Sequence, residues 1–156
     1  MTVHSRAASS GNPTATSSGE RENTMNDEMR QVMHACSAGS LDGSMAFPEV
    51  VGRLAAIGCE QYHADFRRQE KTYYMPDGQS EVAALPVEVS GIPSSFMDHA
   101  LVAALRAIQA GQITYVEFLH RIMAAGCIGY FVNIAGKRAM YFGRNGESYV
   151  EVFPAP

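Results

Sequence analysis

Five polar side chains near the middle of the chain are of the types that bind anions or transfer protons. Apolar and polar residues alternate from residue 62 to residue 67, so His63, Asp65 and Arg67 share one face of an expected strand. Lys71 and Tyr73 share one face of the strand expected next. The spacing therefore allows an imidazole, a carboxylate, a guanidinium, an ammonium and a phenol to converge on one sheet surface, which is the candidate binding site.

This surface has two functional interpretations and one structural interpretation. In the first, Arg67 or Lys71 binds the charge of a small anionic ligand or of a protein partner. In the second, His63 is the general acid or base of a small enzyme and Asp65 orients it. In the structural interpretation, which is the commoner one, the charges form cross-strand ion pairs on a solvated face. Of the two functions, we expect a non-enzymatic binding or interaction module, with the enzyme as the alternative.

The elements that position these residues occur twice in the sequence. A shift of 68 positions aligns residues 47–86 with residues 115–154 without a gap, and 11 of the 40 pairs are identical. Identical pairs most simply serve a shared fold, so divergent polar positions are the more informative ones. The candidate site diverges most, because His63, Asp65, Arg67 and Lys71 have as their counterparts Phe131, Asn133, Ala135 and Ala139.

Each half contains two helical patterns followed by three short strands. Ser95 with Asp98, and Thr114 with Glu117, are spaced as capping boxes, and Gly39 is placed to end the first helix. The fold class predicted is α+β, with internally duplicated helix-helix-three-strand antiparallel units related by pseudo-two-fold symmetry. We expect a single folded domain over residues 25–156, made of two repeats, 25–89 and 94–156. A homodimer through an exposed sheet edge stays open.

Residues 1–24 differ from the rest because Ser and Thr dominate them, and we expect this tail to be disordered. Met25 as the true first residue is an alternative that would remove it. Hydrophobic residues make up 46% of the chain and the formal net charge is −4, which disfavours nucleic acid as a partner. There is no long apolar run and no secretion leader, so we expect a cytoplasmic protein that does not enter a membrane.

The three cysteines are interpreted as core residues rather than reactive thiols. Cys59 and Cys127 each follow a glycine that ends a helix, where the negative end of the helix dipole disfavours a thiolate. Cys36 lies on the apolar stripe of the first helix. His63 and Asp65 supply only two ligands on one face, whereas a zinc site needs three or four. We therefore expect no metal and no cofactor.

Several separated motifs resemble the YbcV-like family, a bacterial family of unknown function whose members are often labelled phage envelope proteins. The resemblance covers roughly residues 27–154 and rests on motifs in the same order: Phe47-Pro48-Glu49-Val50-Val51, Tyr62-His63-Ala64-Asp65, Lys71-Thr72-Tyr73-Tyr74, Pro76-Asp77-Gly78, Ala110-Gly111, Gly126-Cys127, Gly129-Tyr130-Phe131 and Tyr141-Phe142-Gly143. It implies a bacterial protein and carries no catalytic or binding residue. The phage label adds a third interpretation, a phage-derived structural or accessory protein.

Overall fold

Six antiparallel strands form one sheet in the order β3-β2-β1-β4-β5-β6. The computed structural model describes residues 25–154, so the Ser/Thr-rich tail 1–24 lies outside the described residues. The elements are α3 (Asp27–Asp42), α4 (Phe47–Ala56), β1 (Gln61–Asp65), β2 (Glu70–Tyr74), β3 (Ser80–Ala84), α5 (Asp98–Gln109), α6 (Tyr115–Ala124), β4 (Cys127–Asn133), β5 (Arg138–Gly143) and β6 (Ser148–Val152). The fold is α+β, as predicted.

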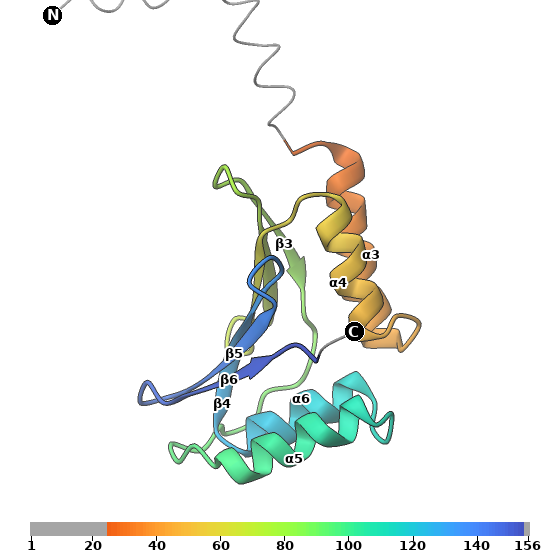
Figure 1. Cartoon of the computed structure of the whole chain (residues 1–156). Coiled ribbons are helices and arrows are strands. Elements are labelled where there is room, and N and C mark those ends of the chain that lie inside the picture. Colours follow the sequence, from red (N-terminus) through yellow and green to blue (C-terminus); the bar gives the residue numbers. More distant parts are fainter. Residues whose placement is uncertain (1–24, 155–156) are drawn as a thin grey trace, which may run out of the picture.

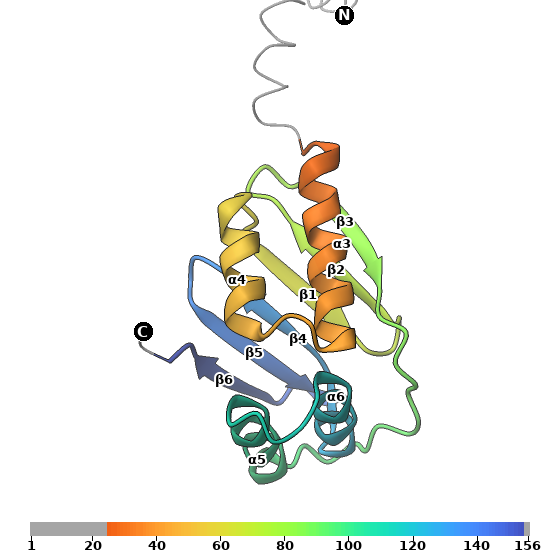
Figure 2. The same ribbon diagram turned by 90° about the vertical axis from the view of Figure 1, so that its right-hand side faces the viewer.

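Two helix-helix-three-strand units meet where β1 pairs with β4 (Figure 2). His63 lies directly opposite Phe131, the residue 68 positions further along the chain. The pairing of β1 with β2 matches that of β4 with β5: Tyr62 pairs with Tyr73, and their counterparts Tyr130 and Tyr141 pair in the same way. The two units therefore share one sheet and a matching register. That they arose by duplication stays an inference from the sequence.

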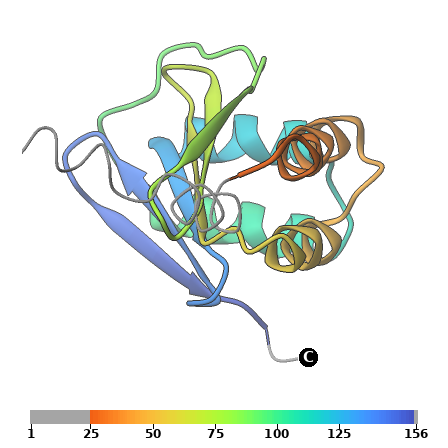
Figure 3. The ribbon, with the colours of Figure 1, turned by 90° about the horizontal axis from the view of Figure 1, so that it is seen from above.

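The helices cover one face of the sheet, which we call the inner face (Figures 1 and 3). Inner-facing residues such as Tyr62, Ala64, Tyr130 and Val132 are buried in the core, whereas their strand neighbours, apart from Gly129, are partly exposed. Between residues 25 and 154 no helix lies against the opposite face, which we call the outer face (Figure 1). None of the described helices is both long and apolar enough to cross a bilayer.

Two helix termini differ from the sequence-based expectation, and tertiary contacts explain both. The first helix does not end at Gly39 but continues to Asp42, and Gly43 caps it in the left-handed region. A Cβ on Gly39 would lie 2.8 Å from Met45 Cγ, so this glycine serves close packing. The Ser95/Asp98 capping box is also wrong: α5 has Met97 as its N-cap, without a side-chain hydrogen bond.

The Thr114/Glu117 capping box at the start of α6 is confirmed, and both of its hydrogen bonds are present. These bonds depend only on residues within one turn, so tertiary contacts do not compete with them. Before α5, in contrast, the chain packs closely on Gly126, because a Cβ there would lie 2.0 Å from the Ser95 carbonyl oxygen. The Met97 N–H donates to Ala125 O at 2.7 Å, which ties this segment to the end of α6.

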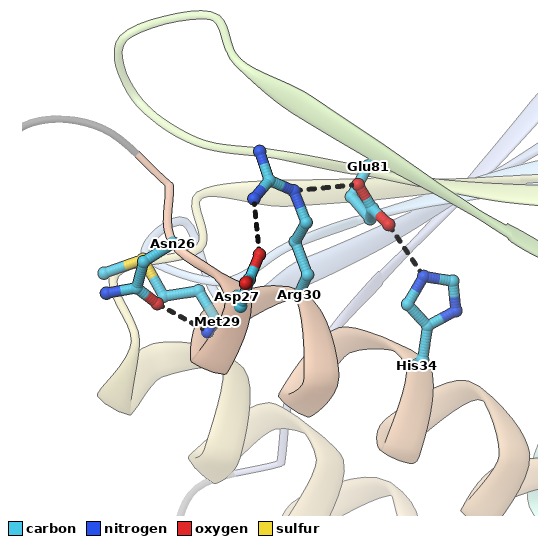
Figure 4. Close-up of polar contacts among 6 residues, drawn as sticks. All are labelled: Asn26, Asp27, Met29, Arg30, His34 and Glu81. Carbon is cyan, nitrogen blue, oxygen red and sulfur yellow. Dashed lines mark hydrogen bonds and ion pairs between the residues drawn. The ribbon is translucent and has the colours of Figure 1, made fainter.

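A carboxylate on each edge strand ties the first helix of its unit to the sheet. Glu81 of β3 forms an ion pair with Arg30, with Oε1 3.3 Å from Nε, and its Oε2 lies 2.8 Å from His34 Nε2. Both partners are on α3 (Figure 4). Glu151 of β6 accepts from Arg106 of α5 at 2.7 Å. These partly exposed ion pairs fix helix position rather than contribute much stability.

We predict that Gly126→Ala destabilises the protein far more than Gly58→Ala, its counterpart in the other unit. Both glycines have positive φ, 96° and 81°, but a Cβ on Gly58 meets nothing closer than 3.8 Å. Gly58→Ala should therefore cost only the strain of the left-handed backbone, about 1 kcal/mol, and Gly126→Ala more than about 3 kcal/mol. Urea unfolding measures both. Equal losses would show that the segment before α5 moves aside at little cost.

Candidate functional site

Three of the five predicted site residues lie together on the outer face of the sheet. His63 and Asp65 are partly exposed residues of β1, and Arg67 is exposed in the turn that follows. They line one side of a shallow hollow of about 110 Å³. Ile128, Gly129 and Phe142, from β4 and β5, line the remainder.

Lys71 and Tyr73 do not belong to this surface. Lys71 pairs with Ala64 and Tyr73 with Tyr62, so their side chains point to the inner face, and they are only 2% and 1% exposed. The residue of β2 opposite His63 is Thr72. The expectation of a single surface holding all five residues is therefore wrong, because the register of the β1–β2 turn places the two sets on opposite faces.

The imidazole of His63 is held against an aromatic ring. It stacks on Phe131, with ring centroids 4.2 Å apart and planes 7° from parallel. Phe131 in turn meets Phe142 edge to face at 5.8 Å. Partial burial lowers the pKa of His63, Arg67 lowers it further, and Asp65 acts in the opposite direction. The ring is therefore neutral at pH 7 and gains its charge only in acid.

Asp65 stabilises the turn after β1 rather than orienting His63. Its Oδ1 accepts from the backbone N–H groups of Arg67, at 3.1 Å, and Arg68, at 3.3 Å. No hydrogen bond joins Asp65 to His63 in the described part of the chain. The contact that a His–Asp general acid–base pair requires is thus not formed in this structure.

Arg67 and Arg68 are neighbours in the sequence but differ in their partners. Arg68 Nε donates to Glu70 at 3.0 Å, forming an ion pair. The guanidinium of Arg67 makes no hydrogen bond or ion pair with any residue from 25 to 154. Arg67 is therefore the charge beside the hollow that is available to an outside group.

The side of the hollow formed by Ile128, Gly129 and Phe142 was not predicted from the sequence. Near Gly129, β4 has a register irregularity between Cys127 and Gly129, whereas β1 pairs with β2 without one. A Cβ on Gly129 would lie 2.5 Å from Ala64 O, so only glycine fits this close strand contact. One feature of the sequence could have pointed to Gly129: the two units differ at this position, because the counterpart of Gly129 in the first unit is Gln61. Bulges of this kind are frequent beside binding sites.

The cysteines lie in the core, as predicted. Cys36, Cys59 and Cys127 are buried free thiols, and burial raises the pKa of Cys59 and Cys127 to about 11. They are protonated and poorly nucleophilic at neutral pH. Among residues 25–154, no group of three or more His, Cys, Asp or Glu side chains could hold a metal ion.

We predict that Asp65→Ala lowers stability by about 1 kcal/mol through loss of the two turn hydrogen bonds. Asp65→Asn should stay within about 0.5 kcal/mol of the wild type because the amide oxygen still accepts both bonds. Urea unfolding of both variants provides the comparison. An equal loss in the two variants would assign the effect to the charge rather than to the turn.

Comparison with known proteins finds relatives in mycobacteria. The uncharacterized proteins Rv2012 of Mycobacterium tuberculosis and Mb2035 of Mycobacterium bovis are each 32% identical to this chain over 119 residues. The match covers 68% of this chain and 73% of each relative. No family model matches the sequence. The chain belongs to the same family as these mycobacterial proteins.

Proposed function

We propose that this protein is a non-enzymatic binding module that holds a small oxyanion, such as a carboxylate or sulfate group, in the outer-face hollow. The observation that carries the proposal is the guanidinium of Arg67, which has no partner among the described residues and lies beside a hollow that His63 also lines. A guanidinium and an imidazole are the usual side-chain donors to such groups.

The size of the hollow limits what it holds. At about 110 Å³ it is well below the roughly 300–1,000 Å³ of pockets that enclose a whole organic ligand. It accommodates one charged group, which belongs either to a free anion or to the acidic side chain of a partner protein. The second unit places Phe131, Asn133 and Ala135 at the matching positions, so the proposal gives one site per chain.

The local charge makes anion binding depend on pH. Arg68 and Glu70 neutralise each other, and the charge of Asp65 offsets that of Arg67. With neutral His63 the hollow carries no net charge, and protonation of His63 adds one positive charge. Binding should therefore be coupled to this protonation, because an anion stabilises the imidazolium and raises its pKa.

We predict that inorganic sulfate shifts the NMR signals of Arg67, His63 and Gly129 in a saturable way. Arg67→Ala should weaken sulfate binding by about tenfold or more, because it removes the unpaired charge beside the hollow. Arg68→Ala is the matched control: it is the neighbouring residue, its charge is already paired with Glu70, and it should retain binding. Equal loss in both variants, or no saturable shift, would contradict the proposed site.

We also predict that sulfate binding strengthens as the pH falls through the pKa of His63, which lies below its ordinary value of 6.5. Sulfate keeps its charge from pH 5 to pH 8, so any change of sulfate affinity over this range comes from a titrating group of the protein. His63→Phe copies the counterpart Phe131 and preserves an aromatic stack without a titrating proton. Its sulfate affinity should be weak and flat with pH. A wild-type affinity that does not change over this range would refute the coupling.

A further inference from the structure

The inner face of the sheet contains a buried amine that the proposed function does not use. Lys71 is only 2% exposed and lies on β2, beneath the helices. In the region from 25 to 154, its Nζ takes part in no hydrogen bond and no ion pair. Buried lysines are rare unless paired, since the charged form loses its hydration.

Aromatic rings surround the amine in place of acceptors. Lys71 Nζ lies 4.6 Å from the ring centroid of Tyr115, the first residue of α6, and 5.5 Å from that of Tyr62 on β1. The Tyr115 hydroxyl hydrogen-bonds to the Tyr130 hydroxyl on β4. Tyr73 packs on Tyr62 at 5.3 Å. Ring faces attract a cation, but more weakly than water or a carboxylate would.

The titratable groups around this amine are neutral. Burial raises the pKa values of Tyr62, Tyr115 and Tyr130 well above their ordinary value, and those of Tyr73 and Cys36 are also raised by burial. Cys36 is the contribution of α3 to this cluster. None of these groups therefore supplies a negative charge to Lys71 near pH 7.

The carboxylates on the adjoining elements are engaged elsewhere. Glu81 of β3 binds Arg30 and His34 of α3 (Figure 4). On α4, Glu49 accepts from Arg53 at 2.7 Å, and both side chains are about half exposed. On α6, Glu117 lies 4.0 Å from Arg121, and both of these are about half exposed as well. A proton on Lys71 thus brings a charge into the core with no counter-ion.

We propose that Lys71 is a buried proton-binding site whose protonation weakens the packing of α6 against the sheet. Tyr115 is both a cover of the amine and the first residue of α6, so water reaches the amine most directly when this end of the helix moves away. In that open form the ammonium is hydrated, whereas in the closed form it lies against the rings of Tyr115 and Tyr62 without a hydrogen-bond acceptor among the described residues.

The pH range follows from the two states of the amine. Burial lowers the pKa of Lys71 from its ordinary value of 10.5 to about 7 in the closed form. Between these values the closed form is neutral while the open or unfolded form holds the proton, so opening becomes easier as the pH falls. The open population should rise about tenfold per pH unit from pH 9 towards pH 7 and then level off. Stability correspondingly rises with pH across this window.

The chain has only two lysines, Lys71 and Lys137, which makes the first measurement unambiguous. With ¹³C-labelled lysine, the Cε signal of Lys71 should titrate in the folded protein with a midpoint near 7, and Lys137 gives the one other lysine signal in the spectrum. This experiment uses the wild type, so it does not depend on any variant folding. A midpoint near 10 for the Lys71 signal would overturn the proposal.

Hydrogen exchange then tests the link to α6. Protection of the α6 amides, corrected for intrinsic exchange, should weaken about tenfold per pH unit as the pH falls from 9 to 7. Lys71→Met, which keeps the volume and removes the proton, should abolish this dependence, while Lys137→Met should retain it. A dependence that persists in Lys71→Met, or one that is the same for every amide of the wild type, would overturn the assignment to α6.

Discussion

The antiparallel pairing of β1 with β4 is the interaction on which the rest of the molecule depends. Each unit alone would be a three-stranded sheet with two free edges, and this pairing joins one edge of each. It also gives both units a common inner face, so the helices of both pack on the same side. The outer face then stays open where the two units meet, and the hollow beside His63 lies there.

Local patterns in the sequence predicted each strand well, but not how neighbouring strands face each other. Alternation placed His63 and Asp65 on one face of β1, and Lys71 and Tyr73 on one face of β2, and both statements hold. Whether the two faces coincide depends on how many residues the turn between the strands takes up. That turn includes Gln69 with a φ of 54°, a geometry without a clear signature in its residue types. Lys71 was therefore assigned to the wrong surface.

The same division between local and long-range causes explains the rest of the site. The capping box of α6 could be predicted because its bonds lie within one helical turn. The one predicted for α5 does not form, because the segment before α5 packs against Gly126 instead. Comparison of the two units indicated His63, Asp65 and Arg67 because they differ from their counterparts. The wall formed by Gly129 and Phe142 required knowledge of strand pairing and of a bulge, which no short segment encodes.

The stack of His63 on Phe131 lies at the point where a residue meets its own counterpart. Two identical chains related by a true two-fold axis would have to place the same side chain on both sides of that axis. A single chain is free of this requirement, and here one side is a titratable ring and the other a hydrocarbon ring. The two sides of this nearly symmetric centre therefore differ in polarity: the side towards Arg67 is polar and the side towards Phe142 is apolar.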